Sequence, residues 1–173
     1  MMDDDALRAD CARCAALCCM APAFYRSDSF GFDKDADTPC PHLDEAHHCA
    51  IHAEREDAGF SGCIVFDCLG AGQRVTQEIF GGRSWRADPA LLAPMAEAFR
   101  AMRQVHELRL LVEEAGKAEL SAHERRTLDA FHAELEPADG WSRETLAAAD
   151  LEALNQRVRD FLPTLRRHFT AAP

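Results

Sequence analysis

All eight cysteines of this 173-residue chain lie between Cys11 and Cys68, and the rest of the chain contains none. Dense disulfides occur in exported domains that are too small to form a core, whereas this chain is long enough for one and is 47% hydrophobic. Unligated thiols in a core would not be concentrated in one part of the sequence. The distribution therefore favours metal ligation over its two alternatives, which are disulfides and unligated thiols.

The first four cysteines have a spacing that suits a helix over residues 5–19. With roughly 100° between successive residues, Cys11, Cys14 and Cys18 lie within about 60° of one another, and Cys19 points about 100° away from Cys18. One helix would thus give three thiolates to one site and a fourth to a neighbouring site. The remaining ligands would come from loops and a hairpin, at Cys40, Cys49, Cys63 and Cys68. Eight thiolates would form two four-ligand sites, for either tetrahedral zinc or iron–sulfur.

The order of the cysteines also matches a known pattern. The first cluster reads Cys11-x2-Cys14-x3-Cys18-Cys19, and further cysteine segments follow at residues 40–43, 49–55 and 62–68. This order resembles the zinc- or iron-chelating domain family named for its CxxCxxCC signature (YkgJ-like), over about residues 8–80, with a counterpart for each cysteine. Three departures are an extra residue in the first cluster, Glu56 in place of proline after Arg55, and an insertion at residues 59–62. The resemblance implies metal binding and no particular reaction.

Four histidines lie between the cysteines, at His42, His47, His48 and His52. A histidine in a polar loop is more often solvated, but imidazole also binds zinc and iron and could replace a thiolate. His42 and His52 are the candidate auxiliary ligands, because they lie inside the segments that match the family.

The composition changes sharply near residue 86. Residues 1–86 contain every cysteine and most glycines, whereas residues 87–173 are rich in Ala, Leu, Glu and Arg. In the first part, residues 64–66 and 74–80 read as two strands of a small hairpin around the turn at residues 69–72. We therefore expect a mainly α chain with a small β-hairpin, in which a Cys-rich metal-binding module (1–86) packs on a C-terminal three-helix bundle (87–173).

Three helices are expected in the second part. Asp88-Pro89 begins the first, which runs to about residue 115 with apolar residues from Leu91 to Leu108 at helical spacing. Ser121 and Glu124 form a capping box for the second, which ends before Pro137. The third begins near residue 143, and Pro163 should kink or restart it.

The charge and the apolar pattern limit the partners. Thirty Asp and Glu against 19 Lys and Arg give a net charge of −11, which disfavours nucleic acid and anionic membranes. The chain lacks an apolar run of the roughly 18–20 residues that span a bilayer, and acidic residues occupy the N-terminus where a signal peptide is basic. We expect a cytoplasmic protein, with a homodimer or a protein partner on the apolar stripe of the first C-terminal helix.

Three functions are compatible with such sites. The first is a metal-binding protein that holds a [4Fe–4S] cluster or zinc, with metal storage or delivery as a variant. The second is an enzyme in which one centre keeps an open position for substrate, and the third is a structural zinc module for protein interaction. Three thiolates on one helix slightly favour iron–sulfur, because zinc favours two short Cys-x2–4-Cys pairs. The sequence has no P-loop, nucleophile elbow, zincin helix or complete calcium loop, so no catalytic residue is predicted.

Overall fold

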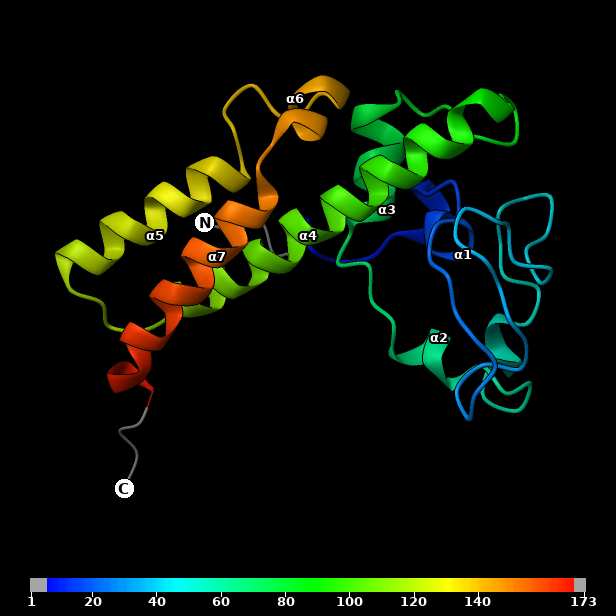
Figure 1. Ribbon diagram of the computed structural model, residues 1–173, viewed down its shortest axis with the longest axis horizontal. Coiled ribbons are helices and arrows are strands. Elements are labelled where there is room, and N and C mark those ends of the chain that lie inside the picture. The colour runs from blue at the N-terminus through cyan, green and yellow to red at the C-terminus, as the bar shows by residue number, and fades with distance from the viewer. Residues whose placement is uncertain (1–5, 170–173) are drawn as a thin grey trace. The chain divides into compact units, whose positions relative to one another are not determined.

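The computed structural model describes residues 6–169 and divides into two compact units, one up to Arg103 and the other from Gln104 (Figure 1). The division falls inside the longest helix, α4 (Leu92–Gly116), whereas the composition changes near residue 86. The other α-helices of the described residues are α1 (Leu17–Met20), α2 (Ser61–Val65), α3 (Ala71–Arg74), α5 (Ala122–Leu135), α6 (Arg143–Ala148) and α7 (Leu151–Phe161). The prediction of a mainly α chain is therefore confirmed.

The predicted β-hairpin is wrong. Ile64 and Val65 belong to α2, and residues 74–80 lie in α3 and in the π-helical turn Val75–Ile79 that continues it. The β-branched residues suggested strands, but the side chains that become buried there recur at a helical spacing: Ala71, Val75, Thr76 and Phe80. Over residues 71–80, burial of one helical face therefore outweighs β-propensity, whereas Ile64 and Val65 are exposed in α2.

The continuous helix predicted over residues 5–19 is also wrong, and its expected start at Asp5 lies outside the described residues. A 3₁₀ turn, Cys11–Arg13, is capped by the Asp10 side chain, which accepts a hydrogen bond from the Ala12 amide. Cys14 then has extended backbone, and Ala16 has a left-handed conformation with a φ of 55°. Because Ala16 ends one segment and begins α1, Cys11 and Cys18 do not share a helix.

Loops that carry cysteines are held together by a small aromatic cluster in the first unit. The Phe24 and Phe30 rings are stacked with centroids 4.5 Å apart, and the Phe32 and Phe60 rings lie 5.0 Å apart. His42 packs edge-on against Phe60 at 5.2 Å. Isolated β-bridges, such as that between Phe24 and Lys34, add backbone hydrogen bonds. These rings form a small aromatic cluster around the buried Phe60, and the cluster packs together segments that have little regular structure.

Helix α4 follows the predicted start signal, since the Asp88 side chain caps a 3₁₀ turn, Pro89–Leu91, that leads into it. Its predicted apolar stripe is buried within the chain, with exposed fractions of 8% or less at Leu91, Met95, Phe99, Met102, Val105 and Leu108. The homodimer or protein partner expected on this helix stays a prediction. None of the helices in residues 6–169 combines the length and apolar character needed to span a bilayer.

Residues 87–169 contain four α-helices where three were predicted, because the last predicted helix is divided. Ala149 has extended backbone between α6 and α7, and the Asp150 side chain caps α7. Pro163 lies in the first turn of a 3₁₀ segment, Leu162–His168, that restarts the helix as expected. Helices α5 and α7 lie side by side (Figure 1), joined by the Phe131 and Phe161 rings at 5.8 Å and by an Arg157–Glu134 ion pair.

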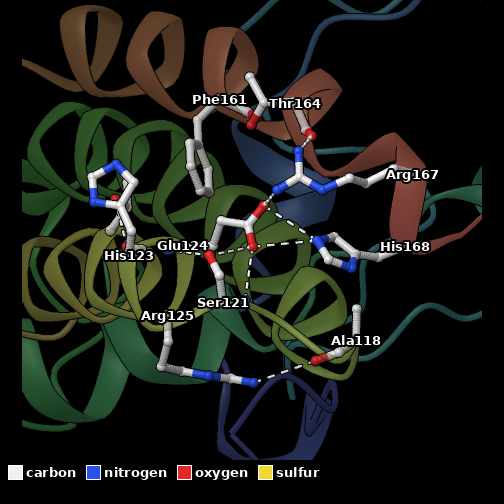
Figure 2. Close-up of polar contacts among 10 residues, drawn as sticks. Ala118, Ser121, His123, Glu124, Arg125, Phe161, Thr164, Arg167 and His168 are labelled. Atoms are coloured by element: carbon white, nitrogen blue, oxygen red, sulfur yellow. Dashed lines mark hydrogen bonds and ion pairs between the residues drawn. The ribbon is translucent and has the colours of Figure 1, made fainter.

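Glu124 joins the start of α5 to the end of the described chain (Figure 2). The predicted capping box is present: the Glu124 carboxylate accepts hydrogen bonds from the Ser121 amide and hydroxyl at 2.8 and 2.7 Å. The same carboxylate forms an ion pair with Arg167, and His168 Nε2 lies at hydrogen-bond distance from it, at 3.2 Å. The Ser121 hydrogen bonds, assisted by His168 and Arg167, lower the pKa of Glu124 to about 2.

Candidate metal centre

All eight cysteines are unpaired thiols in the first unit. Cys11 is exposed and the other seven are partly buried. Half-buried thiols without disulfide partners are a donor set that fits a soft or borderline metal such as zinc or iron. Their arrangement decides how such a metal would be shared among them.

The sulfur atoms of Cys14 and Cys68 both lie close to Gly72 in α3. A methyl group at Gly72 would lie 2.6 Å from Cys14 Sγ and 3.9 Å from Cys68 Sγ, so only the absence of a side chain lets both sulfur atoms approach. The segment before α1 is fixed to the same helical region, because the Thr76 hydroxyl accepts a hydrogen bond from the Ala15 amide at 3.0 Å. Gln77 Nε2 likewise donates to the Arg13 carbonyl at 2.7 Å.

Cys11 and Cys18 belong to the neighbourhood of Cys14 and Cys68. Burial raises the pKa of Cys14 to about 11, and negative charge on Cys68 also raises it. Burial and then the charges of Cys68, Cys19 and Asp10 raise the pKa of Cys11. The pKa of Cys18 is raised by its hydrogen bond to Cys19 and by burial, and further by charge on Cys14 and Cys68. We call these four residues the first cysteine group: Cys11, Cys14, Cys18 and Cys68.

Cys19 acts mainly on the thiols of the later loops, although its charge also raises the pKa of Cys11. Its carbonyl accepts a hydrogen bond from the Cys40 amide at 3.0 Å, and a β-bridge next to Cys40 joins Leu43 to Cys49. Burial raises the pKa of Cys40, Cys49 and Cys63, and charge on Cys19 contributes to each of these increases. We call these four residues the second cysteine group: Cys19, Cys40, Cys49 and Cys63.

The adjacent cysteines of α1 connect the two groups. Their sulfur atoms lie 3.9 Å apart. The hydrogen bond with Cys18 lowers the pKa of Cys19 to about 7 against the opposing effect of burial, and Lys34 and Arg55 lower it further. A thiol with a lowered pKa more readily forms the thiolate that binds a metal.

Two basic residues that the sequence did not single out lie beside the second group. Lys34 is 3% exposed, and its Nζ donates to the carbonyls of Met20, Asp35 and Thr38 at 3.0, 3.0 and 2.7 Å. Arg55 Nη1 donates to the Cys63 carbonyl at 3.1 Å, and its Nε donates to the His52 carbonyl at 2.8 Å. Arg55 lies within the segment that resembles the CxxCxxCC family, so this resemblance could have pointed to Arg55 as part of the site.

The thiols of each group are close enough to alter one another's pKa, but they do not converge on one point. Within residues 6–169, no three His, Cys, Asp or Glu side chains come together closely enough to hold one ion. The candidate auxiliary ligand His42 packs against Phe32 and Phe60, and the His52 carbonyl bonds Arg55. The donor types suit a metal, and the absence of a side chain at Gly72 leaves room beside Cys14 Sγ and Cys68 Sγ.

Comparison with known proteins gives one significant curated relative. The chain is 33% identical over 156 residues to a protein of Bacillus subtilis (strain 168) that is named "Uncharacterized protein YybG". The match covers 90% of this chain and 56% of that protein, so the chain spans little more than half the length of its relative. No protein-family model matches the chain, and no solved structure matches it significantly.

Proposed function

We propose that this protein binds metal in two separate four-thiolate centres, one formed by each cysteine group. The observation that carries the proposal is the environment of α1, where the adjacent Cys18 and Cys19 have different thiol neighbours. The pKa of Cys18 is raised by its hydrogen bond to Cys19, by burial, and by charge on Cys14 and Cys68. Charge on Cys19 raises the pKa of Cys40, Cys49 and Cys63, and it also raises that of Cys11. If Cys18 and Cys19 bind to different centres, each centre has four cysteine ligands and all eight thiols bind metal.

Each centre would hold a [4Fe–4S] cluster or a zinc ion, because both are bound by four cysteine thiolates. When bound, zinc would supply structural cross-linking, and an iron–sulfur cluster would supply one-electron chemistry. The residues of this chain bind and orient: Thr76 and Gln77 fix the segment around Cys14, and Arg55 fixes the loop around Cys63. The resemblance to the CxxCxxCC family supports the same function.

A reducing compartment suits this function. Thiols stay unpaired in the cytoplasm, where disulfides are rare, and all eight cysteines are unpaired in the structure. We therefore place the protein in the cytoplasm as part of the same proposal.

The direct test is elemental analysis of protein purified without oxygen. We expect two zinc ions, or two [4Fe–4S] clusters with equimolar sulfide and broad visible absorption, per chain. Protein that contains neither metal as isolated, and takes up neither on reconstitution, would refute the proposal.

The division of the ligands is tested with matched double variants. C14A/C68A removes two thiols of the first group, and C40A/C63A removes two of the second, so each should keep one centre. C14A/C63A removes the same number of thiols but one from each group, so it should lose both centres. If a within-group pair also lost both centres, or if the cross-group pair kept one, the division would be wrong.

A further inference from the structure

Ser84 and His47 come from distant segments of the chain and meet in the first unit. Ser84 Oγ and His47 Nε2 lie 2.7 Å apart, and both residues are half-buried. The Ser84 hydroxyl also accepts a hydrogen bond from the Arg86 amide at 3.1 Å, which leaves its single proton to be donated to the imidazole. A serine hydroxyl within hydrogen-bond reach of a histidine ring nitrogen is the pairing that activates serine as a nucleophile.

The turn that carries His47 has an uncommon backbone conformation. His47 is left-handed, with a φ of 66°, which is unusual for a residue other than glycine. Its amide donates to the Asp44 carbonyl at 3.3 Å, and the Asp44 carboxylate accepts a hydrogen bond from the His48 amide at 2.8 Å. Backbone conformations of this kind persist only where the surrounding structure enforces them, and they are concentrated at functional sites.

The two residues that follow Ser84 hold the imidazole in place. Trp85 is buried, and its indole Nε1 donates to the Ala15 carbonyl at 2.7 Å. The His47 ring packs edge-on against the Trp85 ring, with centroids 5.9 Å apart. The Arg86 guanidinium lies over the same indole and donates to a carbonyl of the turn at 2.8 Å. The His47 ring is therefore oriented by packing and by the attachment of its turn, as the base of a nucleophile has to be.

We propose that Ser84 is a nucleophile for acyl transfer, with His47 as its general base and a small ester as its substrate. Ser84 Oγ forms a bond to the ester carbonyl carbon, and the bond from that carbon to the alcohol oxygen breaks. The hydroxyl proton passes to His47 Nε2 and then to the departing alcohol. Attack of water on the acyl group, with His47 again accepting the proton, releases the acid and restores Ser84. This activity goes beyond metal binding, because neither residue belongs to a cysteine group.

The experiment uses diisopropyl fluorophosphate, which forms a stable phosphate ester with an activated serine and releases fluoride. The protein is treated as isolated, without oxygen, and the modified peptides are identified by mass spectrometry over time. Ser142 is the internal control, because its hydroxyl is hydrogen-bonded at 3.2 Å to the Thr145 hydroxyl instead of to a histidine. We expect Ser84 to react at least about a hundred-fold faster than Ser142.

Variants and conditions test the role of His47 and the class of substrate. H47N removes the imidazole but keeps a residue that tolerates the left-handed conformation, and it should slow the reaction of Ser84 by at least about a hundred-fold. H48N is the matched control and should leave that rate unchanged. In wild-type protein unfolded in urea, Ser84 should lose its advantage over Ser142, which tests the arrangement even if H47N does not fold. Excess para-nitrophenyl acetate, a small ester, should slow the reaction of Ser84 in the native protein.

Each result supports or overturns one part of the proposal. A rate at Ser84 no faster than at Ser142, an unchanged rate in H47N, or an advantage of Ser84 that survives in urea would overturn the nucleophile–base pair. Modification of Ser84 that excess para-nitrophenyl acetate does not slow would overturn the ester as substrate. Elemental analysis tests metal binding separately, so neither failure can be mistaken for a failure of the proposed function.

Discussion

Replacing Gly72 by alanine changes one methyl group at the position where Cys14 and Cys68 approach each other. Gly72 lies in α3 and is buried, and its backbone is helical, so alanine fits the local conformation. The added Cβ, however, would lie 2.6 Å from Cys14 Sγ. Non-bonded atoms prefer a separation of about 3.5–4.0 Å, so the Cys14 thiol has to move by about 1 Å.

The size of the effect follows from two opposing contributions. Overpacking in a closely packed region costs about 1–3 kcal/mol, and replacing glycine by alanine in a helix gains about 0.5–1 kcal/mol. We therefore expect G72A to lower the free energy of unfolding of the metal-free protein by no more than about 2.5 kcal/mol. Its larger effect should fall on the first cysteine group, whose metal affinity should drop at least ten-fold, or about 1.4 kcal/mol.

The assay combines metal analysis with denaturant unfolding. G72A should retain one metal equivalent of two after dialysis against chelator, while the second cysteine group keeps its metal. Gly116→Ala is the matched control: it adds the same methyl group in helix α4, where the nearest atom, Arg125 Nη1, is 3.4 Å away. If G72A bound both metals as tightly as wild type, Cys14 and Cys68 would not share a centre as we describe.

Three further predictions concern stability. E124Q should lower the melting temperature at neutral pH, because it removes a carboxylate that stabilises the fold. The difference in melting temperature from wild type should disappear as the pH falls from about 4.5 to about 2, because the wild-type carboxylate becomes protonated in that range. R109M should lower the free energy of unfolding, measured in urea, by about 3–5 kcal/mol, because Glu113 stays buried without the Arg109 Nε that lies 2.6 Å from its carboxylate. The double variant R109M/E113L should recover much of that loss, because it leaves no unpaired charge at position 113. F99A should cost about 3–5 kcal/mol in the same assay, because a fully buried ring is lost from the core, whereas an equal stability of wild type and variant would contradict that burial.

The helices of the second half were predictable because their signals are local. The Asp88 cap, the Ser121 capping box and Pro163 each act within one helical turn, and all three features are present. The break between α6 and α7 was missed, because Ala149 is a strong helix former and only the Asp150 cap that follows indicates a new start.

The first half was harder to predict because its structure depends on contacts between distant residues. Ala16 has no sequence feature that favours a left-handed conformation, and its segment is held by Thr76 from far along the chain. The hydrogen bonds of Lys34 likewise connect its side chain to backbone on both sides of a loop. The number and order of the cysteines suggested two sites, but the role of Gly72 follows only from the fold, which places it beside Cys14 Sγ and Cys68 Sγ.

The environment of Lys34 also restricts which amino acid can occupy that position during evolution. All but two of the 19 basic residues of this chain are arginine, and Lys34 is one of the two lysines. An ammonium group has three donors in a compact arrangement, which matches the three carbonyls that surround it, whereas a planar guanidinium is larger and directs five donors in a fixed fork. Position 34 should therefore stay lysine in relatives that share this loop, even where arginine replaces lysine freely at other sites.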